Sequence, residues 1–219
     1  MAELIHGVSA AVVRSNLERV RDEIAGTGRN PDQVEILAAV KYVPAEELMA
    51  LVEAGVALVG ENRAQDLQRK HEAVPDAFTW DFIGHVQSRK VKDVLPLVRY
   101  IHSVASDSVL TQLAKHGNQE TQVLIEVNVA GEAGKTGISP PELPGFLERC
   151  PARVMGLMTM PPFTQSAEDS RRYFSALRDL AEEHGLRHLS MGTSQDYLVA
   201  VQEGATIVRL GTTLYTSAP

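Results

Sequence analysis

The chain has 219 residues, of which 44% are hydrophobic and 22% charged, and its formal net charge is −7. This size permits one large α/β domain or two small ones, and the negative charge argues against a nucleic-acid or anionic-membrane partner. The single cysteine, Cys150, excludes an intramolecular disulfide and a multi-cysteine metal site. The sequence also lacks an apolar run of the roughly 20 residues that a membrane helix needs, and its start lacks a signal-peptide pattern. We therefore expect a cytoplasmic protein.

Helix and strand patterns alternate along the chain. Apolar residues at helical spacing predict an amphipathic helix over residues 8–25, before the first strand. Short apolar runs followed by helix-start signals then predict eight strands, over residues 34–40, 56–59, 79–83, 100–104, 122–129, 153–157, 188–190 and 206–210. Eight strand–helix units without a low-complexity linker favour one (β/α)8 TIM barrel over an open doubly wound sheet.

Capping signals mark several of the intervening helices. Ser106 is a candidate N-cap, and residues 139–142 combine a capping box with proline at the first helical position. Ser194 is expected to cap a helix that Gly204 ends. Each of these helices is the predicted return segment of one strand–helix unit.

The first predicted strand leads to a lysine. Residues 36–40 are apolar, Lys41 follows them, and Pro44 suits the first turn of a helix. Lysine is rarely buried unless it is paired or used. Because ligands of this fold bind at the carboxyl ends of the strands, Lys41 is the first candidate for chemistry.

Polar and glycine residues follow other predicted strands and should meet at the same mouth. They are Asn62, His85, Ser190, Gly192, Ser194, Arg209, Gly211 and Thr212. The loops after strands seven and eight commonly bind phosphate in this fold, and here they carry glycines and hydroxyls. A lysine opposite a phosphate site suggests a phosphorylated carbonyl compound held as a Schiff base. Lysine-dependent aldolases and pyridoxal 5′-phosphate (PLP) proteins both meet that description.

Six blocks of the sequence stand in order along nearly the whole chain. They are AVK at 39–41 with Pro44, GEN at 60–62 with Gln65, Trp80 with FIGH at 82–85 and QS at 87–88, GLMT at 156–159, LSMG at 189–192 with Ser194 and Asp196, and VRLGT at 208–212. Together these blocks resemble the YggS/PROSC family, the pyridoxal phosphate homeostasis or PLP-binding proteins. One block alone would be weak evidence, whereas six in sequence are specific.

The resemblance implies one PLP-binding barrel domain over residues 1–219, of the alanine racemase N-terminal type, with an extra N-terminal helix. It implies that Lys41 carries PLP, a form of vitamin B6, as a Schiff base. It further implies roles for the other residues: the phosphate on Ser190, Gly211 and Thr212 with Gly192 and Ser194 nearby, the pyridine nitrogen facing Arg209, and Asn62 and His85 around the ring or its 3′-oxygen. The family has no firmly established catalytic reaction and keeps free PLP and amino-acid pools in balance.

An arginine against the pyridine nitrogen affects what the cofactor can do. Arginine does not give up its proton, so it leaves that nitrogen unprotonated and makes PLP a weaker electron sink than an aspartate partner would. We therefore expect a monomeric PLP carrier or buffer that supplies PLP-dependent apoenzymes, with no metal. We also expect no second domain of the kind that assists the racemases, because the eighth predicted strand lies close to residue 219. The alternatives are a weak PLP-dependent amino-acid racemase, a Schiff-base aldolase, or an interaction scaffold.

Structural roles compete with some of these functional ones. Arg209 is also a candidate partner for Glu61 inside the mouth, and His102 is interpreted as a structural residue. The glycine-rich segment 131–137 is expected to be a loop at the mouth whose Lys135 can reach a ligand phosphate.

Overall fold

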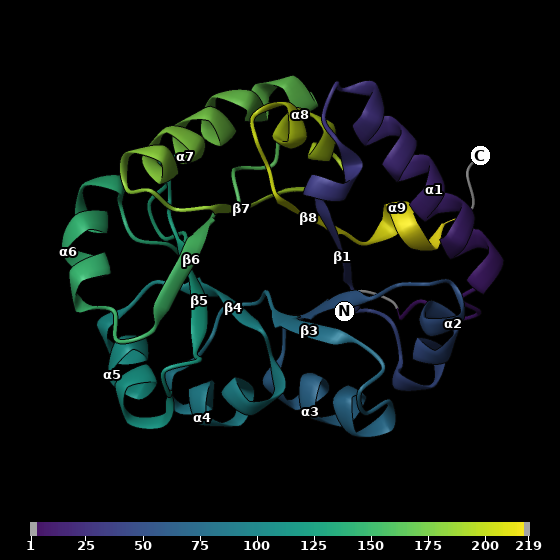
Figure 1. The fold of residues 1–219 in the computed structure, drawn as a ribbon, viewed down its shortest axis with the longest axis horizontal. Helices are drawn as coiled ribbons and strands as arrows, with labels where there is room; N and C mark the ends of the chain where they lie inside the picture. The colour runs from purple at the N-terminus through teal and green to yellow at the C-terminus, as the bar shows by residue number, and fades with distance from the viewer. Residues whose placement is uncertain (1–3, 217–219) are drawn as a thin grey trace.

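The computed structural model describes residues 4–216, and a closed barrel of eight parallel strands lies at its centre (Figure 1). The barrel closes where the last strand pairs with the first, with Ile36 opposite Val208. The strands are β1 (Glu35–Ala39), β2 (Leu58–Glu61), β3 (Thr79–Phe82), β4 (Tyr100–Val104), β5 (Gln122–Glu126), β6 (Arg153–Met158), β7 (His188–Thr193) and β8 (Ile207–Leu210). The predicted (β/α)8 barrel is confirmed, although the predicted domain 1–219 extends at both ends beyond the described residues.

Helices surround the barrel as an outer ring (Figure 1). They are α1 (Ala10–Gly26), α2 (Leu48–Glu53), α3 (Ala64–Ala73), α4 (Val91–Val94), α5 (Asp107–His116), α6 (Leu143–Arg149), α7 (Arg171–Glu183), α8 (Tyr197–Gln202) and α9 (Thr212–Tyr215). Short 3₁₀ helices cover Pro31–Gln33, Ala45–Glu47, Ser88–Lys90, Leu95–Leu97, Pro140–Glu142 and Ala167–Ser170. Within residues 4–216, none of the helices combines the length and the hydrophobicity needed to cross a membrane.

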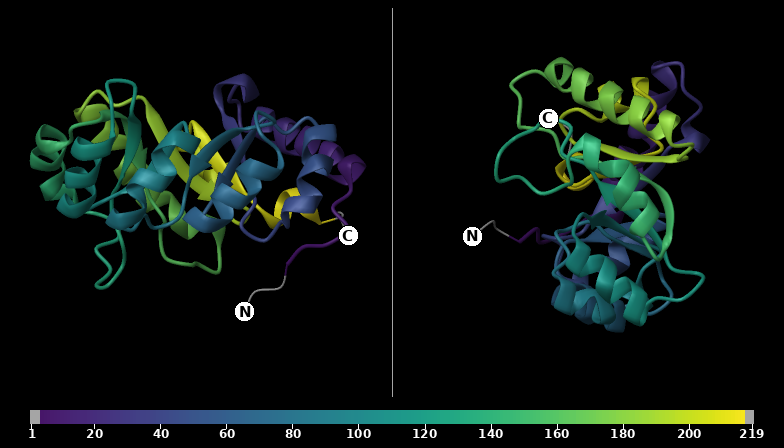
Figure 2. Two further views of the ribbon diagram at one scale, coloured as in Figure 1. Left: turned by 90° about the horizontal axis from the view of Figure 1, so that it is seen from below. Right: turned by 90° about the vertical axis from the view of Figure 1, so that its left-hand side faces the viewer.

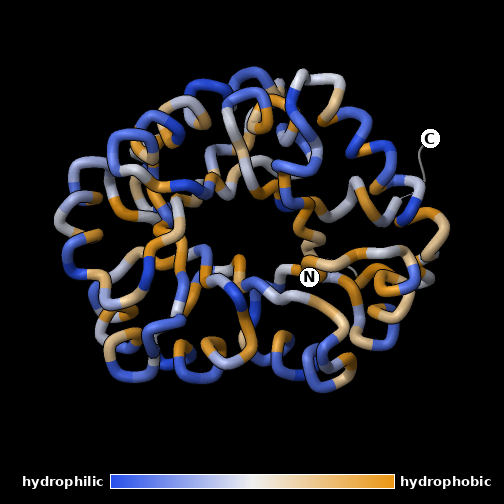
Figure 3. The backbone as a smooth tube through the Cα atoms, in the orientation of Figure 1, coloured by the Kyte–Doolittle hydropathy of each residue, from blue (hydrophilic) through white to orange (hydrophobic). Residues whose placement is uncertain are grey.

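Hydrophobic side chains form two buried layers. The larger lies between the strands and the helices, whose outer surfaces are mostly hydrophilic (Figure 3). The smaller fills the inside of the barrel, and its buried members are Leu37, Leu58, Tyr100, Leu124, Met158 and Ile207. This inner layer fills the interior of the barrel beneath the carboxyl ends of the strands, where ligands of this fold bind.

Helix α1 precedes the barrel, as predicted, and anchors the end of the chain. Its apolar stripe is buried, and the side chain of Ser9 accepts a hydrogen bond from Val12 N at its start. The buried amide of Asn16 donates to the carbonyls of Leu214 and Thr216, at 3.1 and 2.9 Å. This contact fixes α9, a short helix after β8 that the sequence analysis did not predict.

Three strands extend further than the sequence indicated, β6 by the single residue Met158. β2 includes Gly60 and Glu61, which lie beyond the predicted strand 56–59. Glycine suits position 60 because an added Cβ would sit 2.4 Å from Leu37 Cδ2, and Glu61 is tolerated in the strand because it pairs with Lys70. β7 continues to Thr193 rather than ending at residue 190.

The capping predictions have mixed outcomes. Ser106 caps α5, and the capping box at Ser139 and Glu142 is present. The prediction for Ser194 is wrong, because α8 begins only at Tyr197. The longer β7 delays the helix start, and the hydroxyl of Ser194 has other partners in the site.

Candidate functional site

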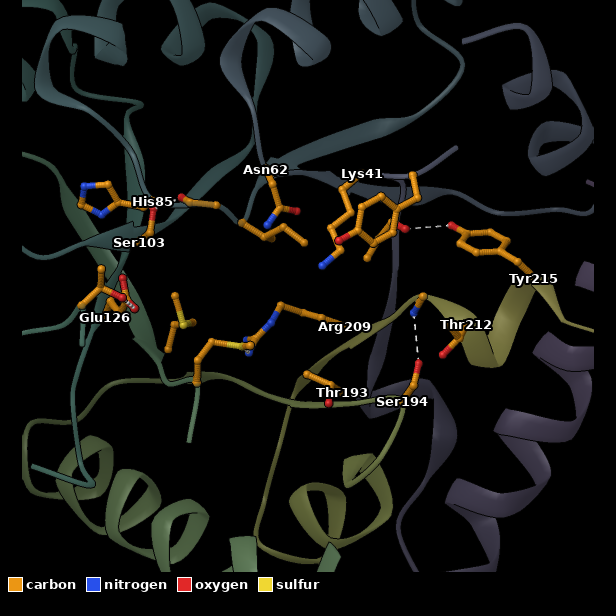
Figure 4. Close-up of a pocket in the computed structure, with 18 of the residues that line it drawn as sticks. Lys41, Asn62, His85, Ser103, Glu126, Thr193, Ser194, Arg209, Thr212 and Tyr215 are labelled. Atoms are coloured by element: carbon orange, nitrogen blue, oxygen red, sulfur yellow. Dashed lines mark hydrogen bonds between the residues drawn. The ribbon is translucent and has the colours of Figure 1, made fainter. Parts of the chain in front are cut away.

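A cavity of about 370 Å³ opens at the carboxyl ends of the strands (Figure 4). Seven of the nine predicted site residues line it: Lys41, Asn62, His85, Ser194, Arg209, Gly211 and Thr212. Lining residues that the sequence analysis missed include Ile5, Tyr42, Ser103, Glu126, Thr136, Thr193 and Tyr215. Two long loops, after β5 and after β6, project from one face of the barrel (Figure 2), and Thr136 and Met160 of these loops reach the cavity.

Lys41 lies in a turn rather than at the end of a buried strand. β1 ends at Ala39, Val40 N still donates to Gly60 O, and the chain then turns through a Val43 N to Val40 O hydrogen bond of 3.0 Å. The Lys41 side chain is exposed, and its amine points toward the centre of the cavity (Figure 4). Its Nζ is 4.6 Å from the centre of the Tyr42 ring.

A cradle of hydroxyls and backbone amides faces Lys41 across the cavity. Ser194 Oγ accepts hydrogen bonds from Gly211 N and Thr213 N, at 3.2 and 3.3 Å. These bonds tie the loop after β7 to the turn after β8, and the bond from Gly211 N is the dashed line at Ser194 in Figure 4. Thr193 and Thr212 add hydroxyls to the same wall. Such a wall suits an anion with several acceptor oxygens.

Ser190 and Gly192 are not among the lining residues of this cavity. Ser190 is completely buried, and its hydroxyl contacts His102 and Arg209 instead. Gly192 has φ 91°, and an added Cβ would lie 2.6 Å from Ala200 Cβ. This glycine therefore lets β7 pack closely against α8, which is a reason for its presence that involves no ligand.

Arg209 lies in the floor of the cavity with only 6% of its surface exposed. Nη1 donates to Ser190 O and Oγ at 2.7 and 2.6 Å, and Nη2 donates to Thr159 O at 2.9 Å and to Met160 Sδ at 2.8 Å. Within residues 4–216 these neutral groups are its acceptors, and Nε donates to none of the described residues. Burial lowers the pKa of Arg209 to about 10, so the guanidinium is still charged at neutral pH.

The alternative partner of Arg209 is engaged elsewhere. Glu61 Oε2 lies 2.6 Å from Lys70 Nζ, and both side chains are buried. The prediction that Arg209 pairs with Glu61 is therefore wrong. We expected Lys135 to reach the ligand, but its Nζ lies 3.9 Å from Glu132 Oε2. Its neighbour Thr136 lines the cavity instead.

A buried polar chain continues from Arg209 into the barrel. His102 Nδ1 is 2.9 Å from Ser190 Oγ, and His102 Nε2 is 3.0 Å from Asp81 Oδ2. Because a carboxylate only accepts hydrogen bonds, Nε2 carries the proton and Nδ1 accepts from the Ser190 hydroxyl. The three residue types are those of a serine hydrolase triad, but the ring nitrogens are exchanged, since in the triad Nε2 contacts the serine and Nδ1 the aspartate. All three side chains are also buried, so the serine is not available to a substrate. His102 is structural, as interpreted, and it orients Ser190 beneath Arg209.

The far side of the cavity offers hydrogen-bond acceptors. His85, Ser103 and Glu126 lie there, opposite Lys41 (Figure 4). Glu126 Oε1 accepts from Thr136 Oγ1 at 2.5 Å. The buried oxygen of Asn62, Oδ1, has no hydrogen-bond partner in the part of the chain that the structure describes. A ligand that donates a hydrogen bond to Asn62 would satisfy this oxygen.

A single barrel with a lysine and an anion cradle at its mouth defines the class of protein. The family model for the alanine racemase N-terminal domain matches residues 8–219. The pyridoxal phosphate homeostasis protein of Aquifex aeolicus is 40% identical over 213 residues, which cover 91% of this chain and 93% of the relative. That of Pseudomonas aeruginosa is 35% identical over 207 residues, covering 90% of each chain. The chain belongs to the pyridoxal phosphate homeostasis protein family.

Solved structures agree with this classification. PipY of Synechococcus elongatus, solved with PLP bound, has a TM-score of 0.79 at 27% identity and covers 93% of this chain and 100% of its own. A lysine/ornithine decarboxylase from Vibrio vulnificus has a TM-score of 0.70 at 14% identity and covers 97% of this chain and 64% of its own. At that identity, the second likeness shows the fold alone.

The buried hydrogen bonds that join Asp81, His102 and Ser190 should make the folded protein less stable at acidic pH. Burial lowers the pKa of His102 below its ordinary 6.5, so the unfolded chain binds this proton first and the unfolding free energy falls as the pH drops from 6.5 toward the folded-state pKa. Burial raises the pKa of Asp81, but the hydrogen bonds and charges of His102 and Arg99 outweigh burial and lower this pKa below 3.8. The stability that ionised Asp81 contributes is therefore lost only at still lower pH. His102→Gln should reduce the loss of unfolding free energy as the pH falls below 6.5, measured by urea unfolding at a series of pH values.

Burial also lowers the pKa of half-buried His188. In the His102→Gln variant, His188 should therefore preserve part of the pH dependence of the unfolding free energy. The control is His116→Gln on the surface of α5, which should keep the full acid loss. An unchanged slope in His102→Gln would show that this buried histidine is not the source.

Proposed function

We propose that this chain binds PLP as a Schiff base on Lys41 and acts as an intracellular carrier or buffer of the cofactor. The observation that carries the proposal is that the Lys41 amine shares one cavity of about 370 Å³ with the cradle formed by Ser194, Gly211 and Thr212. The PLP-bound structure of PipY and the names of the homologous proteins support the same cofactor. The proposed binding unit is the single barrel, with no metal.

The residues of the cavity fit PLP in their chemistry. The cradle of Ser194, Gly211 and Thr212 suits the phosphate, and the unsatisfied Asn62 Oδ1 suits a ligand hydroxyl. Bound PLP would supply an aldehyde, with which the neutral amine of a lysine condenses to a Schiff base, releasing one water. Lys41 is the lysine that lines this cavity.

Arg209 favours the carrier role over the racemase role. Its four terminal contacts leave Nε as the donor available to the pyridine nitrogen. A guanidinium with a pKa of about 10 stays protonated at neutral pH, so it donates a hydrogen bond without protonating that nitrogen. The cofactor then gains little power to stabilise a carbanion, which racemisation requires.

The exposure of Lys41 favours transfer of the cofactor. The side chain is exposed to solvent at the barrel mouth, so a cofactor held by Lys41 would lie where water and an acceptor apoenzyme have access. A reversible bond in an accessible position allows PLP to be released as well as held. PLP-dependent apoenzymes in the cytoplasm are the proposed acceptors.

Lys41→Ala should abolish covalent PLP binding. Wild-type protein mixed with PLP should show an absorption band near the visible edge that borohydride removes, because reduction converts the imine into a stable amine. Mass spectrometry of the reduced protein should then find the added mass on the peptide containing Lys41. The control is Lys92→Ala, an exposed lysine of α4, which should behave as wild type. A wild-type protein that cannot be loaded would contradict the proposal.

Ser194→Ala should weaken PLP binding by about tenfold, since the variant loses the acceptor of two amide hydrogen bonds that shape the cradle. Pyridoxal, which has the aldehyde but no phosphate, should bind the variant and the wild type within about twofold of each other. Titration with both compounds measures the difference. Ser139→Ala, at a remote capping box, is the control. An equal loss for both compounds would argue against a phosphate-binding role.

Wild-type protein loaded with PLP should exchange the α-proton of alanine slowly. In deuterated water, followed by NMR, the rate should stay below about 1 s⁻¹, the low end of common enzyme turnover. The reason is the arginine that faces the cofactor in place of an acid. Exchange at rates typical of enzymes would overturn the carrier role and favour the racemase.

A further inference from the structure

A buried ion pair lies directly behind Lys41 and outside the cavity. Lys70 of α3 and Glu61 at the end of β2 approach to 2.6 Å, and their side chains are 2% and 0% exposed. Neither lines the cavity that contains Lys41. The pair therefore has no direct contact with a ligand bound there.

The pair holds the backbone next to two site residues. Lys70 Nζ donates to the carbonyl of Val40, the residue before Lys41, at 2.6 Å. Glu61 Oε1 accepts from Asn62 N at 2.6 Å and from Arg63 N at 3.2 Å. One ion pair thus ties the turn after β1 to the turn after β2.

Stability alone is a poor explanation for this arrangement. Removing two charges from water carries a large desolvation cost, and replacing a buried ion pair by apolar side chains is often neutral or stabilising. Position 70 lies on the buried face of α3 with Leu67, where an apolar side chain is the ordinary choice. What an apolar side chain cannot do is donate a hydrogen bond to the Val40 carbonyl.

Lys41 depends on its backbone for orientation. Its Nζ forms no hydrogen bond or ion pair with the described residues, and it lies over the ring of Tyr42 in a cation–π contact. The backbone around it is held at three carbonyls: Ala39 O accepts from Tyr215 Oη at 3.2 Å, Val40 O from Lys70, and Tyr42 O from Ile5 N at 2.8 Å. Of these three bonds, the one from Lys70 is charge-assisted and fully buried, which makes it the strongest.

We infer that Lys70, neutralised by Glu61, is a positioning residue that directs the Lys41 amine into the cavity. This inference rests on the proposed function, since Lys41 is the PLP-binding lysine only there. The Lys70 ammonium acts through the Val40 carbonyl on the turn that carries Lys41. Loss of this donor should impair bond formation by Lys41 and spare the non-covalent contacts of the ligand.

The test compares two ligands on one variant. Lys70→Met alone would leave the Glu61 carboxylate buried without a cation, which threatens folding. The double variant Glu61→Gln/Lys70→Met avoids this, because glutamine is neutral and keeps an acceptor for Asn62 N. Leu113→Ala, a buried residue of α5 remote from the cavity, is the control for general destabilisation.

The ligands are PLP and pyridoxine 5′-phosphate, which has an alcohol in place of the aldehyde and forms no imine. For the double variant we expect the dissociation constant of PLP to rise at least tenfold, in line with the sensitivity of reactions to small misplacement of a reacting group. That of pyridoxine 5′-phosphate should change less than twofold. Formation of the borohydride-reducible adduct at Lys41 should slow by a similar factor of ten. Leu113→Ala should change none of these values below its unfolding temperature.

Each outcome separates the hypotheses. If the wild type forms no adduct at Lys41, the proposed function fails. If the wild type forms it and the double variant matches the wild type, Lys70 does not position Lys41. An equal loss of both ligands in the double variant would show a general structural role and would also overturn the inference.

Discussion

The burial of one cation, Arg209, shapes the barrel mouth. A buried charge is stable only when hydrogen bonds replace its hydration, and here four neutral groups from Ser190, Thr159 and Met160 do so. These acceptors belong to β7 and to the loop after β6, so the guanidinium of Arg209 in β8 links these three neighbouring parts of the barrel. Its described hydrogen-bond acceptors include no carboxylate, whereas Asp196 and Glu126 lie close enough to favour its charged form. The cavity floor therefore presents a charged guanidinium to a ligand.

The periodicity of the sequence was enough to predict the barrel and most of the mouth. Strand ends in a parallel barrel meet at one face, so Lys41, Asn62 and Arg209 could be placed together without knowing any distance. Whether a side chain near the end of a strand points into the core or into the cavity depends on where the strand ends. Because β7 runs to Thr193, Ser190 lies within the strand and points into the core, and Ser194 meets the cradle instead. That these mouth residues bind a cofactor stays a prediction.

Buried polar pairs were the part that the sequence did not reveal. Glu61 and Lys70 are nine residues apart, and Asp81 and His102 are twenty-one apart, so neither pair has a local pattern. Each becomes visible only when the barrel brings a helix or a neighbouring strand into contact. The signal that was present is the polar residue within an otherwise apolar strand, as with His102 in β4. Such a residue requires a buried partner, although the sequence does not say which.

The same barrel occurs in a decarboxylase at 14% identity, so the fold does not decide between a catalyst and a carrier. The proposed carrier role depends on how Lys41 and Arg209 are held. The arginine is enclosed by neutral hydrogen-bond acceptors and keeps its proton, which would limit carbanion chemistry on a cofactor that it faces. The lysine has an exposed side chain on a backbone fixed from behind by Lys70, Tyr215 and Ile5. An amine held in this way has a defined direction and remains open to solvent. These are the properties that the proposed carrier role requires of Lys41.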